Sequence, residues 1–210
     1  MERFNKENFH RICDHITTRD NDLLHIVEQY GYPPFWTRTN TFETIVLTIL
    51  EQQVSLASAY AAYKRLKEKL TFITPKNLLQ LSDEELRNCY FSRQKIIYTR
   101  ELANTILSKK INLKKFYDEE DTVIRKELKQ LKGIGDWTID IYLIHALQRT
   151  DVFPIGDLAL VNAIKIIKGW DTITKEEILK IAQTWKPYRS IATMLLWHFY
   201  IKKKNIKLLH

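Results

Sequence analysis

Cysteine is scarce in this chain, and its scarcity excludes several kinds of metal and redox protein. The 210 residues include only two cysteines, Cys13 and Cys89. Two thiols are too few for a disulfide framework, a four-cysteine zinc site or a four-cysteine iron–sulfur cluster. The six histidines show no ligand spacing that cysteines or carboxylates support. We therefore expect two unpaired structural thiols, no zinc and no iron–sulfur cluster.

Long apolar runs are also missing. No stretch of about 18 apolar residues occurs, and the N-terminal sequence MERFNKENFHRI lacks the apolar core of a secretory signal. The sequence thus predicts no membrane partner. It predicts a soluble intracellular protein.

Glycine and proline are rare, which favours helices joined by short connections. Only five of each interrupt the chain, and helix-spaced apolar positions occur nearly throughout. The sequence predicts an all-α protein without a linker between domains. Helix starts are expected at residues that commonly begin helices, namely Asp20 or Asn21, Ser55, Pro75, Ser82, Ser92 and Thr174. A further helix is expected over residues 118–131.

Basic residues outnumber acidic ones. Lys and Arg total 33 against 25 Asp and Glu, a formal net charge of +8. This excess favours an anionic partner such as nucleic acid but does not identify one. The basic ends at 108–110 and 202–204 are expected to be solvated helix ends, and we assign them no role in binding.

The segment LKGIGDWTID, residues 131–140, places two glycines between strongly helical stretches. Gly133 and Gly135 permit a tight reversal and a close approach to a surface. The following helix would expose backbone N–H groups at its start, which suits a phosphate. The alternative is an ordinary turn between two helices.

Asp157 follows Trp137 by twenty residues, in the segment VFPIGDLAL. After Pro154 and Gly156 it is placed to cap a helix. Capping alone would explain it. A second role, in catalysis, is compatible with capping. A helix N-terminus favours an ionised carboxylate, and a cationic sugar needs such a carboxylate beside it when a glycosidic bond breaks.

Trp197 lies in the late segment WKPYRSIATMLLWHFYIKKK, residues 185–204. Tyr188, Ala192, Leu195 and Phe199 form one helical stripe, and Trp197 projects from nearly the opposite face. The segment is therefore either a helix buried on all sides or one that presents Trp197 to a base-binding pocket.

Together these segments resemble a known family. LKGIGDWT, VFPIGDLAL, the upstream ILEQQVSLASA (49–59) and WKPYRSIATMLLW resemble the helix-hairpin-helix (HhH-GPD) DNA glycosylase superfamily, and within it the type II 3-methyladenine DNA glycosylases. The resemblance runs in order over residues from about 42 to 200. It implies an all-α, two-lobed fold with the active site between the lobes. One lobe would span about 41–149 with the hairpin at 131–137, and the other 1–40 plus 150–210.

The resemblance also assigns roles to residues. It places the catalytic carboxylate on Asp157 and the base pocket on Trp137 and Trp197. It assigns DNA phosphate to the hairpin amides of Gly133, Gly135 and Trp137. A Na⁺ or K⁺ ion held by hairpin backbone carbonyls is implied, with no other cofactor.

Three departures from the family pattern qualify it. Bifunctional relatives carry a lysine nucleophile where this chain has Trp137, which cannot form a Schiff base. Only about 40 residues precede the match, so the extra N-terminal domain of the type II enzymes is not expected. Gln53 stands where such an enzyme inserts a leucine wedge, which leaves Gln52 and Gln53 as the wedge region.

The sequence thus predicts a monomeric, monofunctional DNA glycosylase of base excision repair. It would flip alkylated purines out of damaged double-stranded DNA and leave an abasic site. Two alternatives stay open: a non-catalytic hairpin module that binds DNA, and an oxidised-base glycosylase-lyase.

Overall fold

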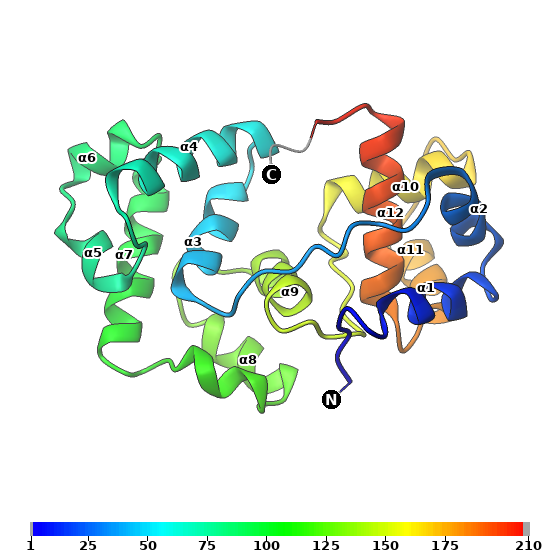
Figure 1. Ribbon diagram of the computed structural model, residues 1–210, viewed down its shortest axis with the longest axis horizontal. Helices are drawn as coiled ribbons and strands as arrows, with labels where there is room; N and C mark the ends of the chain where they lie inside the picture. Colours follow the sequence, from blue (N-terminus) through cyan, green and yellow to red (C-terminus); the bar gives the residue numbers. More distant parts are fainter. Residues whose placement is uncertain (1, 208–210) are drawn as a thin grey trace. The chain divides into compact units, whose positions relative to one another are not determined.

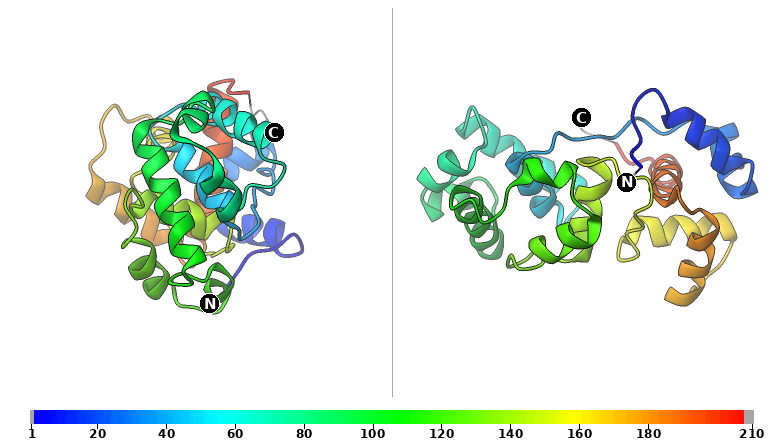
Figure 2. Two further views of the ribbon diagram at one scale, coloured as in Figure 1. Left: turned by 90° about the vertical axis from the view of Figure 1, so that its left-hand side faces the viewer. Right: turned by 90° about the horizontal axis from the view of Figure 1, so that it is seen from below.

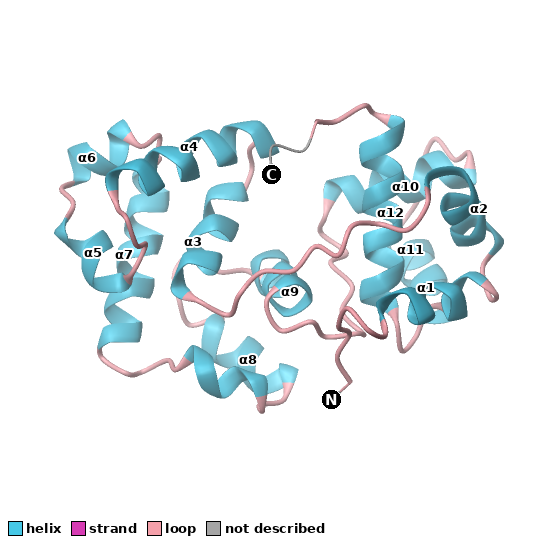
Figure 3. Cartoon of the chain, in the orientation of Figure 1, coloured by secondary structure: helices cyan, strands magenta, loops and turns pink. Residues whose placement is uncertain are grey.

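The computed structural model describes residues 2–207 and consists of helices and connecting loops. Within these residues there are twelve α-helices and one 3₁₀ helix, and Figure 3 shows no strand. Arg3 and Arg149 form an isolated antiparallel bridge. The predicted all-α class is confirmed. Met1 and residues 208–210, which the predicted lobes include, lie outside the described residues.

The chain divides into two compact units. Unit 1 comprises residues 2–37 and 143–207, and unit 2 comprises residues 38–142. Unit 2 begins and ends earlier in the chain than the corresponding expected lobe, which spans about 41–149. The last turn of α9 (Asp136–His145) belongs to unit 1, because His145 contacts Trp36 and Trp197 there.

Unit 1 is built around α12 (Arg189–Lys203). Its other helices are α1 (Phe9–Thr17), α2 (Asn21–Tyr30), α10 (Leu158–Lys168) and α11 (Lys175–Thr184). Figure 1 shows α1 and α2, in blue, beside α12, in red, although the two ends of the chain are far apart in sequence. All residues from 190 to 196 are buried, so this part of α12 is covered on every face.

Unit 2 contains the helices of residues 38–142. They are α3 (Phe42–Glu51), α4 (Leu56–Lys69), α5 (Pro75–Gln80), α6 (Asp83–Asn88), α7 (Arg93–Leu107), the 3₁₀ helix η1 (Leu113–Tyr117) and α8 (Asp121–Leu128), followed by most of α9. Helix α7 packs against α3, α5 and α6, and α3 also packs against α4 (Figure 2).

Side-chain caps set the expected helix starts. Asp20 Oδ1 accepts hydrogen bonds from the backbone N–H of Asp22 and Leu23. The side chains of Ser55, Ser82, Ser92 and Thr174 each accept a bond from the third residue beyond, and Pro75 is the first residue of α5. These predictions are confirmed. The helix expected over 118–131 is shorter and spans Asp121–Leu128. Residues 118–120 form the turn after η1, and the chain leaves helical geometry after Leu128 to form the glycine hairpin.

None of the helices in the described part of the chain is both long and apolar enough to cross a membrane.

Candidate functional site

The glycine hairpin joins α8 to α9 in unit 2, and Gly133 is required there for two reasons. Its backbone adopts a φ of +81°, a region that side chains disfavour. A Cβ atom at Gly133 would lie 2.2 Å from Cδ2 of Tyr98, so the aromatic ring packs directly on the backbone. Helix α7 thus supports the hairpin through Tyr98, a residue that the sequence analysis did not single out.

Gly135 differs from Gly133, because it is exposed and open. A Cβ atom built on Gly135 would meet nothing within 4 Å. Its carbonyl accepts a hydrogen bond of 3.1 Å from the backbone N–H of Ile139, which begins the ladder of α9. The surface over the start of α9 is therefore free of neighbouring protein atoms at Gly135, which leaves room for a ligand to approach closely.

Gln52 braces the hairpin from the end of α3. Its Nε2 donates to the carbonyl of Gly133 at 2.9 Å and to Oγ1 of Thr138 at 2.8 Å. Gln53, by contrast, is exposed and takes a left-handed backbone with a φ of 57° in the turn before α4. Of the two residues expected in the wedge region, Gln52 is thus held by the hairpin and only Gln53 projects from the turn.

An ion-pair cluster ties α8 to α9 beneath the hairpin. Arg125 donates to Asp140 at 2.5 Å and lies 3.8 Å from Asp136, which also pairs with Lys129 at 2.6 Å. Asp140 is buried, and this burial raises its pKa from 3.8 to about 6, although the nearby Arg125 guanidinium opposes the rise. Trp137, the second residue of α9, is half-buried in the same unit.

Asp157 lies in unit 1 as the N-cap of α10. A turn in which its N–H donates to the carbonyl of Pro154 at 2.8 Å brings it to the helix start. Its Oδ1 accepts from the backbone N–H of Leu160 at 2.8 Å and from the indole Nε1 of Trp197 at 3.0 Å. Both donors hold Oδ1 of the carboxylate in a fixed orientation at the start of α10. The structure thus brings together the predicted catalytic residue and one predicted pocket tryptophan.

Trp197 is only half-buried, unlike the fully buried residues that precede it in α12. Its indole ring stacks on the imidazole of His145, with ring centroids 5.5 Å apart and planes 10° from parallel. Nδ1 of His145 lies 2.8 Å from the carbonyl oxygen of Trp36. Trp36, His145, Trp197 and Asp157 therefore form one continuous row of contacts in unit 1.

The same pairing of a capping aspartate with an indole occurs a second time in unit 1. Asp20 caps α2, and its Oδ2 accepts from Nε1 of Trp185 at 2.8 Å. Trp185 is buried, with 3% of its surface exposed, so this second pair is part of the core. An aspartate cap bonded to an indole is therefore not by itself a catalytic arrangement. The partial exposure of Trp197 distinguishes the Asp157 pair.

Sequence reasoning missed His145 and Trp36. His145 lies outside the motifs of the sequence, and Trp36 lies in a loop without a motif. The contact between them joins residues 109 positions apart in the chain, so no local pattern could have indicated it. Trp137 belongs to unit 2, and its expected share in a pocket with Trp197 stays a prediction.

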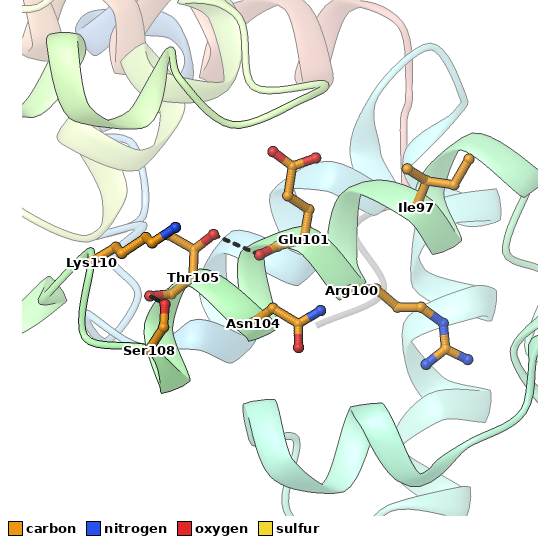
Figure 4. Close-up of a pocket in the computed structure, with 7 residues that line it drawn as sticks. All are labelled: Ile97, Arg100, Glu101, Asn104, Thr105, Ser108 and Lys110. Carbon is orange, nitrogen blue, oxygen red and sulfur yellow. Dashed lines mark hydrogen bonds between the residues drawn. The ribbon is translucent and has the colours of Figure 1, made fainter.

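A groove of about 660 Å³ along α7 is not a better candidate. Figure 4 shows its lining, which comes from α7 and the residues just after it. Arg100 pairs with Asp83, the Thr105 hydroxyl bonds the carbonyl of Glu101, and the Glu101 carboxylate accepts from the backbone N–H of Lys132. These side chains stabilise the fold and do not converge on a ligand. Among residues 2–207, no three His, Cys, Asp or Glu side chains are grouped so as to hold a metal ion.

The buried carboxylate of Asp140 predicts a pH-dependent stability. Because its pKa is about 6 in the folded chain and 3.8 ordinarily, the folded state binds more protons between these values. The contribution of Asp140 to stability is thus greatest at acid pH and falls as the pH rises through this window. Between pH 4 and 7, the free energy of unfolding of Asp140→Asn should rise relative to the parent by roughly 2–3 kcal/mol.

Urea denaturation at several pH values would measure this difference. Asp136→Asn is the matched control, since it removes an exposed carboxylate from the same Arg125 cluster and solvent screens it. A stability difference between Asp140→Asn and the parent that does not change with pH would contradict the prediction.

The chain is similar to known proteins along most of its length. Residues 46–187 match the model of the HhH-GPD superfamily base excision DNA repair proteins. DNA-3-methyladenine glycosylase 1 of Schizosaccharomyces pombe is 29% identical over 194 residues, which cover 87% of this chain and 84% of that protein. A DNA-3-methyladenine glycosylase of Bacillus subtilis is 30% identical over 169 residues, covering 74% of this chain and 56% of its own length.

Two solved structures are also similar. The S. pombe 3-methyladenine DNA glycosylase in complex with abasic DNA superimposes with a TM-score of 0.84 and 26% identity, over 92% of this chain and 97% of that one. The DNA-3-methyladenine glycosidase of Bacillus halodurans gives a TM-score of 0.76 and 28% identity, over 98% and 95%. The family model alone covers more than half of the residues. The chain belongs to the HhH-GPD superfamily of base excision DNA repair proteins.

Proposed function

We propose that this protein is a monofunctional DNA glycosylase of base excision repair. It hydrolyses the N-glycosidic bond of alkylated purines such as 3-methyladenine and 7-methylguanine and leaves an abasic site. The observation that carries the proposal is the half-buried carboxylate of Asp157, held at the start of α10 by the Leu160 N–H and the Trp197 indole. Relatives along most of the chain are named as 3-methyladenine glycosylases, which supports the substrate class.

The chemistry requires one carboxylate. Methylation at N3 of adenine or N7 of guanine makes the purine cationic and a good leaving group, so no general acid is needed to protonate it. As the bond breaks, positive charge develops on the sugar, and Asp157 stabilises that charge. The same carboxylate can orient the water that attacks the sugar. The hydrogen bonds to Oδ1 fix the carboxylate in place before the reaction, so no reorganisation is needed in the transition state.

The target nucleotide must leave the base stack before the carboxylate can reach its sugar. Extrusion costs roughly a few kcal/mol and is least costly for damaged bases, so selectivity begins there. We assign Trp137 and Trp197 to the base pocket, where stacking and cation–π attraction would favour a cationic purine. His145 stacks on the Trp197 ring, and the side chain of Trp197 stays partly exposed, so a base could contact it.

The hairpin is assigned to DNA phosphate. The open surface at Gly135 and the N-terminus of α9 suit a close approach of a phosphate to the backbone N–H groups of Gly133, Gly135 and Trp137. Such contacts position duplex DNA without reading its sequence. Gln53, exposed in its turn, is the proposed wedge into the vacated stack. We propose a monomer as the active form.

An alkali ion would be held in the hairpin by backbone carbonyls. Those of Leu131 and Gly133 each accept one hydrogen bond, from the Ile134 N–H and from Gln52 respectively. A carbonyl oxygen has a second lone pair, so both remain able to coordinate Na⁺ or K⁺. The ion would add positive charge where the phosphate binds.

Two other functions are less well supported. A non-catalytic DNA-binding module would not need a partly exposed carboxylate beside Trp197, and release of free base by the purified protein would exclude it. A glycosylase-lyase would need an amine nucleophile, which Trp137 does not offer at the position where bifunctional relatives carry lysine.

Replacing Asp157 with asparagine tests the catalytic assignment. Asparagine keeps an oxygen for both hydrogen bonds but carries no charge, so the fold and the DNA affinity should stay unchanged. Loss of ~3–4 kcal/mol of transition-state stabilisation would slow base release roughly 10²–10³-fold. Single-turnover excision of 7-methylguanine from duplex DNA, with enzyme in excess, measures this step.

Asp20→Asn is the matched control, because Asp20 also caps a helix and also accepts a bond from an indole. Its excision rate should equal that of the parent. If Asp157→Asn excises within a few-fold of the parent, Asp157 is only a helix cap.

The absence of an amine at residue 137 predicts that the product strand stays intact. Reaction with methylated duplex DNA should leave abasic sites that break only when alkali is added. Gel electrophoresis before and after alkali treatment, with borohydride present in a parallel sample, would show this. A borohydride-stable adduct between protein and DNA would refute the monofunctional assignment.

The two hairpin glycines predict separable defects. Gly133→Ala should lower the free energy of unfolding by about 1–3 kcal/mol, because it meets the Tyr98 ring and takes a left-handed φ. Gly135→Trp should keep stability within about 1 kcal/mol of the parent, since the position is open. It should nevertheless weaken binding to duplex DNA of any sequence.

Chemical denaturation and fluorescence anisotropy with two unrelated duplexes measure the two effects. Unchanged affinity in a folded Gly135→Trp variant would make the hairpin a plain turn between helices.

A further inference from the structure

His145 is fixed by the chain segment that follows α2. The residue is buried at the end of α9, and its Nδ1 lies 2.8 Å from the carbonyl oxygen of Trp36. A carbonyl oxygen can only accept, so Nδ1 must carry the hydrogen and donate it. This bond sets the tautomer and orients the imidazole plane.

The imidazole in turn orients the indole of Trp197. The planes are nearly parallel, at 10°, and the centroid separation of 5.5 Å is that of an offset stack. Rotation of the indole about its side-chain bonds would break this stack. The indole orientation matters because its Nε1 donates to Oδ1 of Asp157 at 3.0 Å.

We propose that His145 is a positioning residue for Asp157, acting through the ring of Trp197. The inference rests on the proposed glycosylase function, for which Asp157 is the catalytic carboxylate. The stack on His145 holds the indole N–H on the carboxylate, and the bond to Trp36 holds the imidazole in the stack. His145 does not touch the reacting atoms in this role. Its removal should therefore affect the chemical step and leave DNA affinity unchanged.

His198 provides a matched control on α12. It is also buried, its Nε2 lies 3.1 Å from the carbonyl of Tyr30, and its ring lies 6.2 Å from that of Trp36. It therefore shares the burial and the backbone hydrogen bond of His145, while its ring contact is with Trp36. His198→Phe should keep the excision rate of the parent.

A double-mutant cycle with Trp197→Phe tests the proposal, because phenylalanine keeps a ring but has no N–H for Asp157. His145→Leu conserves much of the volume and removes both the stack and the donor. It should slow single-turnover excision of 7-methylguanine at least tenfold in the parent, about the effect of a weakened hydrogen bond to a charged group. In the Trp197→Phe background it should have less than a roughly twofold effect, because residues that act as one unit are non-additive.

Equal slowing in both backgrounds would overturn the proposal, since His145 would then act independently of the indole. A parent-like rate for His145→Leu would also overturn it. Should His145→Leu fail to fold, the same cycle with His145→Gln decides, because glutamine has no aromatic face to stack on the indole. It should slow excision at least tenfold in the parent and less than about twofold in the Trp197→Phe background, and any other result would overturn the proposal.

The activity of the parent protein distinguishes a failure of this inference from a failure of the proposed function. If the parent releases no methylated base, the glycosylase assignment fails. If the parent is active and the cycle is additive, only the role of His145 fails. All rates are compared below the melting temperature of the least stable variant, so that unfolding does not contribute.

Discussion

The burial of α12 on every face is the constraint on which unit 1 depends. Residues 190–196 are all buried, so the helix cannot turn or slide without exposing apolar surface or creating voids. Trp197 is the next residue of α12, so the packing of residues 190–196 fixes the position of its backbone. The hydrogen bond from its indole to Asp157 therefore has a rigid origin on one side and a helix N-terminus on the other. This is how a packed core can orient a single carboxylate.

In unit 2, contacts with other helices support one glycine of the hairpin and leave the other exposed. Tyr98 supports Gly133 from one side, and the Gln52 amide bonds the carbonyl of the same residue. Gly135 is left uncovered. Packing thus covers the backbone at Gly133 and leaves the backbone at Gly135 exposed.

Unit 1 contains two pairs of a capping aspartate and a tryptophan indole, which differ in burial. Asp20 with Trp185 and Asp157 with Trp197 have the same chemical groups and similar bonds. Burial of Trp185 makes the first pair part of the core, whereas Trp197 and Asp157 are both partly exposed. Solvent access, which depends on packing, separates the two.

Features that arise from neighbouring residues could be predicted from the sequence. Capping side chains predicted the helix starts, and the position of Asp157 after VFPIG predicted its N-cap role, because each cap bonds an amide two or three residues away. The folded chain was needed to show that Gln52 bonds Thr138, 86 positions along the chain, and that the Trp36 carbonyl bonds His145, 109 positions along. Such contacts depend on how helices pack, and no spacing within one segment records them.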